Sequence, residues 1–302
     1  AICRPRPFRR LNHIVKLLKF KPHSKFSKKS NQSDDRRYPC SLSCSRRSCD
    51  ESCRSCTRHS RRLWHGNRLI MTPIDHANEV IASVRQKTDR AILFYSCGKD
   101  SEVLLDLMAP HFKEIVCVFM YFVKGLDHID NYLRAVKARY ANVTILQVPH
   151  WTLTRVLRCG LYCIPNPNVK LLSLKDVDES VRMKTGISYS FYGMKQSDGM
   201  NRCLMLRGYE NEAISNTNKV YPLSKWKKSD VMAYIKAKKL PEPISYNKNK
   251  SQGLTFLPEV FDYLRRHYPQ DLEKIYKVFP LSRNILLRYD EEKRAAAQIQ
   301  AK

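Results

Sequence analysis

The stretch that decides the fold runs from Ala91 to Met108 and reads AILFY-SCGKDS-EVLLDLM. Its first part, Ala91–Tyr95, is a short unbroken apolar run, which predicts a strand buried in a parallel sheet. Its last part, Glu102–Met108, has apolar residues at helical spacing, and Pro110 marks the end of that predicted helix. The polar loop Ser96–Ser101 joins the two. A strand, a short polar loop and a helix in this order are typical of the start of a βαβ unit.

The same alternation continues along the chain. Further strands are predicted at 115–122, 142–148 and 188–192, and helices at 75–87, 128–140, 153–157, 176–184, 228–238, 258–268 and 271–278. We therefore predict an α/β fold with a doubly wound, mostly parallel sheet and a helical C-terminal portion. Ser224 or Ser229 is expected to cap the helix at 228–238. Residues 290–302 are expected to form a frayed, charged tail.

Composition excludes several classes of protein. The chain has 302 residues, a hydrophobic fraction of 43%, 9 Gly and 15 Pro, which excludes a collagen-like fibre and fits a globular protein. No apolar run approaches the ~18 residues that a membrane-spanning helix needs, so no membrane partner is expected. The formal net charge of +27 points to an anionic partner such as a nucleotide or a nucleic acid.

Residues 1–70 differ in composition from the rest. They hold 19 Lys/Arg and 4 Asp/Glu, a net of +15, whereas residues 71–302 hold 36 and 24, a net of +12. We weigh a metal site, a basic nucleic-acid-binding arm, a transit peptide and a disordered extension outside the fold. We favour the last, with Met71 as the start of the working protein, because the spacings of the cysteines lack two matched pairs. The metal site would use Cys40, Cys44, Cys49, Cys53 and Cys56 with His59 or His65.

We accordingly divide the chain into the extension 1–70, a main domain 71–255 and C-terminal helices with a tail at 256–302. The main domain contains five scattered cysteines and the chain shows no signal-peptide pattern, which favours reduced thiols and a cytoplasmic setting. The expected buried thiols include Cys159, Cys163 and Cys203, the last in the helix-like stretch Asn201–Leu206.

The loop Ser96–Ser101 has the properties of an anion-binding site. A loop that enters a helix presents unpaired N–H groups, and the helix dipole adds positive potential. Gly98 lets the backbone approach a phosphate closely, Lys99 adds a charge, and two serines add hydroxyls. The loop is not a Walker A motif, but it follows a strand, where open α/β sheets bind their ligands. The competing interpretation is a capped strand–helix turn with a surface lysine.

Three ordered blocks carry a resemblance to a known family. Tyr95–Ser101 resembles the pyrophosphate-binding loop of the adenine nucleotide alpha-hydrolase (PP-loop) superfamily, and within it that of the phosphoadenosine phosphosulfate (PAPS) reductase family. Gly193–Arg202 is similar to the family's Gly-x-Arg-x-x-Glu-Ser-x-x-Arg segment. Tyr221–Ile235, followed by Leu240–Tyr246, is similar to its Pro-Ile-x-x-Trp block. The resemblance spans roughly residues 88–255, and three blocks are more specific than one loop.

The resemblance implies an enzyme that binds ATP, adenylyl sulfate or PAPS and acts at a phosphate or sulfate group. Lys99 and Asp100 would be catalytic, mainly by stabilising charge on the leaving group, and Asp100 is a candidate ligand for Mg²⁺. No iron–sulfur cluster is expected. The implied nucleotide-binding residues are Ser96, Cys97, Gly98, Lys99, Asp100, Ser101, Gly193, Lys195 and Arg202.

Several departures limit what the resemblance implies. No cysteine follows Cys203, so the C-terminal nucleophile of the reductases is missing from this sequence. Lys195 and Asp198 stand where the family has Arg and Glu, and the change from Arg loses a bidentate fork. Cys97 replaces a loop glycine and is expected to have a packing role. Asp127 or Asp130 would have to replace the family's Asp-Thr-Gly carboxylate, although neither is in register.

Two other functions compete with this one. The first is an ATP-dependent enzyme that installs sulfur in nucleic acid, as in DNA phosphorothioation, for which the charge of residues 71–302 is favourable. The second is a regulatory protein that binds the nucleotide without turnover. The sequence leaves the acceptor, a nucleic acid or a protein, and the oligomeric state open.

Overall fold

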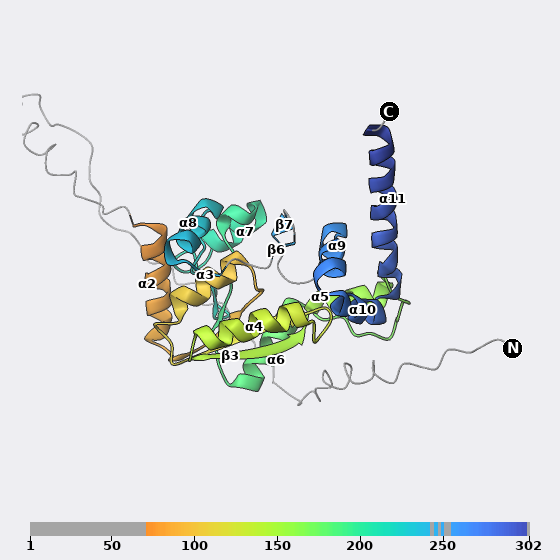
Figure 1. Cartoon of the computed structure of the whole chain (residues 1–302). Helices are drawn as coiled ribbons and strands as arrows, with labels where there is room; N and C mark the ends of the chain where they lie inside the picture. The colour runs from red at the N-terminus through yellow and green to blue at the C-terminus, as the bar shows by residue number, and fades with distance from the viewer. Residues whose placement is uncertain (1–70, 242–244, 247–248, 251–254, 301–302) are drawn as a thin grey trace, which may run out of the picture. The chain divides into compact units, whose positions relative to one another are not determined.

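A computed structural model of the chain describes residues 71–241, 245–246, 249–250 and 255–300 (Figure 1). The contacts divide the chain into Ala1–Ile70 and Met71–Lys302, and the description below concerns the second unit. The predictions made for residues 1–70, including the candidate metal site, lie outside the described residues.

The centre of the fold is a five-stranded sheet in which every pair of neighbours is parallel. Its order is β3-β2-β1-β4-β5. The chain moves outward from β1 through β2 to β3 and then returns to the other side of β1 with β4. The strand order therefore reverses between β1 and β4, and this confirms the predicted doubly wound sheet. The bounds are β1 (Arg90–Phe94), β2 (Glu114–Tyr121), β3 (Val143–Pro149), β4 (Ser190–Phe191) and β5 (Lys219–Val220).

Helices connect the strands and follow them. The first seven are α2 (Pro73–Arg85), α3 (Lys99–Met108), α4 (Asp127–Arg139), α5 (Trp151–Cys159), α6 (Leu174–Thr185), α7 (Met200–Arg207) and α8 (Lys228–Lys238). The C-terminal ones are α9 (Pro258–His267), α10 (Pro269–Val278) and α11 (Arg283–Gln300). The shorter elements are the 3-10 turns η1 (Gln196–Asp198) and η2 (Pro280–Ser282) and the antiparallel pair β6 (Ser245–Tyr246) and β7 (Asn249–Lys250).

The alternation of side chains along the strands produces two apolar layers. Leu93 and Cys117 face the larger core, which also holds side chains of α2, α3, α4 and α8. Ile92 and Val116 face the other core, with Val177 and other side chains of α6 and with one of α7. Figure 1 accordingly shows α4 and α6 on opposite sides of β3. Both faces are covered, which explains why the strands read as continuous apolar runs.

The C-terminal helices pack on one another and join the larger core through buried side chains such as Phe261 and Phe279. The predicted helical C-terminal portion is therefore present. The frayed tail predicted at 290–302 is wrong as far as Gln300, because α11 continues through it. Good helix formers fill this stretch, and Arg265 of α9 binds Asp290 at 2.8 Å. No helix among the described residues is long and apolar enough to cross a membrane.

The helix α8 has the predicted bounds but a different cap. Lys227, not Ser224 or Ser229, is the N-cap residue, and its backbone N–H donates to Asp230 Oδ2 at 2.8 Å. Ser224 is fully buried in the turn before the helix, where its N–H donates to the carbonyl of Tyr221 at 3.0 Å. The Asp230 carboxylate in the first turn thus satisfies the N–H of the N-cap residue, as the acidic residue of a capping box does, and it lies at the positive end of the helix dipole.

Candidate active site

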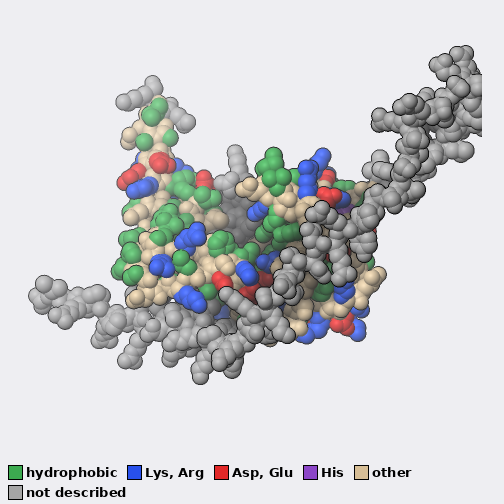
Figure 2. All heavy atoms as spheres, turned by 180° about the vertical axis from the view of Figure 1, so that it is seen from behind, with side chains coloured by type: hydrophobic (Ala, Val, Ile, Leu, Met, Phe, Trp, Pro, Cys, Tyr) green, Lys and Arg blue, Asp and Glu red, His purple; other side chains and the backbone are tan. Residues whose placement is uncertain are grey.

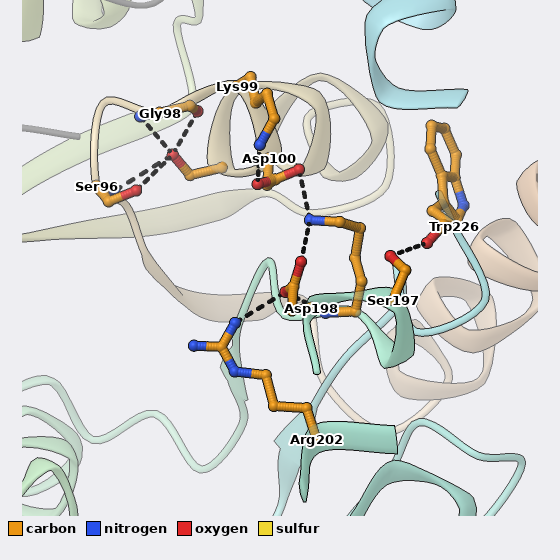
Figure 3. Close-up of polar contacts among 10 residues, drawn as sticks. Ser96, Gly98, Lys99, Asp100, Ser197, Asp198, Arg202 and Trp226 are labelled. Carbon is orange, nitrogen blue, oxygen red and sulfur yellow. Dashed lines mark hydrogen bonds and ion pairs between the residues drawn. The ribbon is translucent and has the colours of Figure 1, made fainter. Parts of the chain in front are cut away.

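The loop after β1 is folded around one hydroxyl group. Ser101 Oγ accepts hydrogen bonds from the N–H groups of Gly98 (3.2 Å) and Ser96 (3.3 Å) and donates to the Gly98 carbonyl (2.9 Å) (Figure 3). The Ser101 side chain is buried. The loop is therefore preorganised at the start of α3, and Ser101 serves its shape as well as its polarity.

Cys97 lies inside this loop in a left-handed conformation, with φ of 58°. Its side chain is fully buried in the larger core, which agrees with the expected packing role. Burial raises the pKa of the thiol well above its usual range, and the nearby Glu102 carboxyl acts in the same direction. The Cys97 side chain is thus a neutral packing group. Cys97 could therefore contact a ligand only through its backbone.

Five charged side chains form a row that links the two loops after β1 and β4, and we call it the charged row: Lys99, Asp100, Lys195, Asp198 and Arg202. Lys99 Nζ lies 2.7 Å from Asp100 Oδ2, and Lys195 Nζ lies 2.8 Å from Asp100 Oδ1 (Figure 3). Lys195 Nζ also lies 3.0 Å from Asp198 Oδ1, and Arg202 Nη1 lies 2.9 Å from Asp198 Oδ2. Cations and carboxylates alternate, and the three cations exceed the two carboxylates by one charge.

The members of the charged row differ in exposure. The whole Lys195 residue is 2% exposed, whereas the Arg202 side chain is 47% exposed and that of Lys99 18%. Burial alone would raise the pKa of Asp198, but hydrogen bonds from Lys195 and Arg202 outweigh it and lower that pKa. Lys195 is therefore held between two carboxylates inside the protein, while the cations at the ends of the row are more accessible.

Gly193 allows the two loops to approach each other. A Cβ atom at this position would lie 3.2 Å from the Asp100 carbonyl carbon and 3.3 Å from Asp100 Cβ, which is tighter than an ordinary contact. The residue lies two positions after the end of β4, and Asp100 lies in the first turn of α3. The first two blocks of the sequence therefore meet between β1 and β4, at the point where the strand order reverses.

The third block adjoins the second. Ser197 Oγ donates to the Trp226 carbonyl at 3.0 Å (Figure 3), and the Gln196 N–H donates to the Ser224 carbonyl at 2.9 Å. Trp226 is itself buried, and its indole N–H donates to the Pro73 carbonyl at 2.8 Å. The three blocks that the sequence analysis singled out are thus neighbours in space.

Sequence reasoning missed a buried carboxyl group beside the loop. Glu102 is fully buried and accepts a hydrogen bond from the hydroxyl of Tyr95, which is also buried. The sequence does contain a sign of this group, because Glu102 directly follows the loop and lies on a helix face that is otherwise apolar. Asp127 and Asp130, considered as replacements for the family's carboxylate, bind Lys274 and the Gln147 amide respectively, each at 2.8 Å.

The residues present do not fit a protein-built metal site. No group of three or more His, Cys, Asp and Glu side chains among the described residues is arranged to hold a metal ion. The two oxygens of Asp100 each face a lysine, and each oxygen of Asp198 faces a basic side chain.

Three other cysteines also bear on the chemistry. Cys163 is buried as predicted, but Cys159 is exposed and Cys203 is partly exposed, so the prediction was wrong for these two. Cys159 ends α5 on the side away from the core, and Cys203 lies on the short helix α7, of which Leu206 is the buried residue. Both helices bury few of their side chains, Leu153 and Thr154 in α5 and Leu206 in α7, which explains both differences.

The family model for the phosphoadenosine phosphosulfate reductase domain matches residues 90–251, more than half of the chain. The chain belongs to the PAPS reductase family. The resemblance seen in the three blocks is thereby confirmed. A crystal structure of PAPS reductase from Candida auris in complex with phosphate is similar, with 15% sequence identity, a TM-score of 0.38 and coverage of 55% of this chain and 81% of that chain. No curated protein matches the chain.

Proposed function

We propose that this PAPS reductase-family protein binds an adenine nucleotide, ATP, adenylyl sulfate or PAPS, on the loop Ser96–Ser101 and acts at its phosphate or sulfate group. One observation carries the proposal. The phosphate-type loop after β1 and the basic segment after β4 meet where the strand order reverses, joined by the Asp100–Lys195 ion pair at 2.8 Å. Open α/β sheets bind ligands at this place.

The parts of the site have distinct roles in this proposal. The free N–H groups at the start of α3 and the dipole of this ten-residue helix would receive phosphate oxygens. Lys99 would exchange Asp100 for the ligand, because Asp100 keeps Lys195 as a partner. Arg202, at the exposed end of the charged row, would neutralise a further anionic group. Catalysis would be electrostatic, by stabilising charge that develops on the departing phosphate or sulfate.

The thiols favour transfer or hydrolysis over reduction. Nucleophilic attack on sulfur needs a thiolate, and burial raises the pKa of both Cys97 and Cys117. Cys203 is partly exposed, with its Sγ 3.8 Å from Gln196 Oε1. We therefore propose a nucleotidyl transferase or hydrolase rather than a reductase that attacks with its own thiol. The described cysteines are free, which supports a reducing, cytoplasmic setting.

The acceptor is not assigned to nucleic acid. On the face drawn in Figure 2, the Lys and Arg side chains of the described residues occur in several separate places, with acidic and hydrophobic side chains between them. A nucleic-acid footprint is expected to gather basic side chains on one face or stripe. The described residues on this face thus give a nucleic-acid acceptor no advantage over a protein or a small molecule.

Calorimetric titration of the full chain with ATP, adenylyl sulfate and PAPS tests the proposal. We expect Lys99→Ala to weaken the affinity for the bound nucleotide by about tenfold to a hundredfold, the loss of one charge-assisted hydrogen bond. Lys113→Ala is the matched control, because Lys113 is an exposed lysine paired with Asp89 at 3.0 Å. Equal affinity of the wild type and Lys99→Ala would refute the assignment of the loop. Phosphorus NMR of the same mixtures identifies any product.

A further inference from the structure

The phosphate-type loop is bracketed by two buried residues that bind each other. Tyr95 directly precedes Ser96, Glu102 directly follows Ser101, and the Tyr95 hydroxyl donates to Glu102 Oε2. The two residues are 1% and 0% exposed. This hydrogen bond therefore links the residue before the loop to the first turn of α3 after it.

A second tie reaches the same oxygen from another element. The hydroxyl of Tyr132, on α4, lies 3.4 Å from Glu102 Oε2 as a donor. Because α4 follows β2, this contact connects the loop after β1 with the neighbouring βα unit. Glu102 Oε2 thus accepts from two tyrosine hydroxyls, and Glu102 does not belong to the charged row.

The surroundings of Glu102 are costly for a carboxylate. Burial raises the pKa of Glu102, while the hydrogen bond from Tyr95 and the charge of Arg139 act against the rise. The thiols of Cys97 and Cys117 lie in the same buried region, and Asp106 adds a like charge. An apolar side chain would pack here without the cost of desolvation, so the carboxyl group is there for its hydrogen bonds.

We propose that Glu102 is a positioning residue, which holds the loop Ser96–Ser101 in its anion-binding shape by fixing Tyr95 and Tyr132. The proposal rests on the proposed function, in which this loop holds the phosphates. Glu102 acts through the tyrosines and has no contact with the nucleotide. The hydrogen-bond acceptor, rather than the negative charge, is the property that matters, because a negative charge beneath the loop would repel a phosphate.

The chain offers a matched control one turn further along α3. Asp106 also accepts two tyrosine hydroxyls, from Tyr140 at 3.0 Å and Tyr234 at 2.8 Å. Tyr140 directly follows α4, Tyr234 lies on α8, and neither adjoins the loop. Asp106→Ala therefore removes the same kind of interaction from the same helix without touching the loop.

The test compares Glu102→Gln, Glu102→Ala and Asp106→Ala in the full chain by calorimetry with the nucleotide that the wild type binds. We expect Glu102→Ala to weaken binding about tenfold or more, and Glu102→Gln, which keeps an acceptor, to stay within about threefold of the wild type or to bind more tightly. Asp106→Ala should lose thermal stability but keep its affinity. Equal affinity of Glu102→Ala and the wild type would overturn the positioning role of Glu102 and leave the proposed nucleotide binding unaffected.

A second measurement needs no nucleotide. Amide hydrogen exchange of the unliganded variants should show faster exchange at Ser96–Ser101 in Glu102→Ala than in Asp106→Ala at matched stability. Equal exchange of this loop in the two variants would overturn the positioning role. If the wild type binds none of the three nucleotides, the proposed function fails, whereas the exchange result still decides whether Glu102 fixes the loop.

Discussion

At the scale of single residues, Cys97 shows how the loop departs from a glycine-rich pattern. Its φ of 58° is a conformation that glycine adopts without strain and that a side chain with a Cβ adopts at a cost of about 1 kcal/mol. Burial of its side chain in the core stabilises the folded state and offsets part of this cost. The residue is therefore a compromise between a strained backbone and a filled core.

This compromise predicts an unusual order of stability at position 97. We expect Cys97→Gly to be more stable than Cys97→Ala by about 1 kcal/mol in urea unfolding, since glycine removes the strain of the positive φ. Cys117, buried in the middle of β2, supplies the control. There the ordinary order should hold, with Cys117→Gly less stable than Cys117→Ala. The same order at both positions would contradict the strain at Cys97.

At the scale of elements, the approach of β4 to α3 depends on Gly193. A Cβ at this position meets the Asp100 backbone at 3.2–3.3 Å, so Gly193→Ala should push the segment after β4 away from the loop. We expect a loss of about 1–3 kcal/mol in stability, the usual cost of overpacking, together with weaker nucleotide binding. Gly208→Ala is the control, because its nearest contact would be an ordinary 3.6 Å. Equal stability of the two variants would show that the approach is not tight.

Sequence patterns predicted the elements with many apolar residues and missed those defined by pairing. The long apolar runs of β1 and β2 were recognised within one residue at each end. The two-residue strand β5 has no pattern of its own, and it exists because Val220 pairs with Phe191 of β4. Helix α11 was mistaken for a frayed tail because its exposed half has no apolar periodicity.

The sequence predicted which residues belong to the candidate site, but it did not predict the ion pairs between them. The three blocks identified the loop residues and the basic segment, since short motifs have a fixed residue order. The burial of Lys195 between two carboxylates depends on contacts between loops about a hundred residues apart, as its 2.8 Å pair with Asp100 shows. Glu102 was not predicted because it belongs to no motif, and its role depends on the hydrogen bond from Tyr95, which the sequence does not show.

At the scale of the whole unit, a residue of the C-terminal helices caps a helix of the sheet domain. Asp271 of α10 is fully buried and accepts from the backbone N–H groups of Asp127 (2.8 Å) and His128 (3.0 Å) at the start of α4. It also lies 2.7 Å from His128 Nδ1. Lys274 adds a hydrogen bond of 2.8 Å to the Gly125 carbonyl. These contacts fix the loop after β2, the strand that pairs with β1.

This junction predicts lower stability at acidic pH. Burial lowers the pKa of His128 below its usual 6.5 despite the bond to Asp271, so the unfolded chain binds the proton first. The contribution of neutral, buried His128 to the free energy of unfolding is complete above about pH 6.5. It is lost as the pH falls toward the pKa of His128 in the folded state. Burial would raise the pKa of Asp271, but the bonds from His128 and Asp127 lower it, so its contribution also declines in acid, below the window of His128.

Urea unfolding at about pH 7.5 and about pH 5.5 measures this dependence. We expect the wild type to lose stability at the lower pH and His128→Asn to lose less. His150, whose pKa burial also lowers, contributes in the same direction, so the variant should keep part of the slope. An unchanged pH dependence in His128→Asn would show that His128 does not report on the junction.

The central claim is that the loops after β1 and β4 together bind an adenine nucleotide. Amide hydrogen exchange of the full chain, with and without saturating ATP, adenylyl sulfate or PAPS, tests it most directly. We predict slower exchange at Ser96–Glu102 and at Gly193–Arg202 with the nucleotide that binds, and unchanged exchange in α6, which lies on the other face of the sheet. Protection elsewhere without protection of these two segments, or no protection with any of the three nucleotides, would contradict the claim.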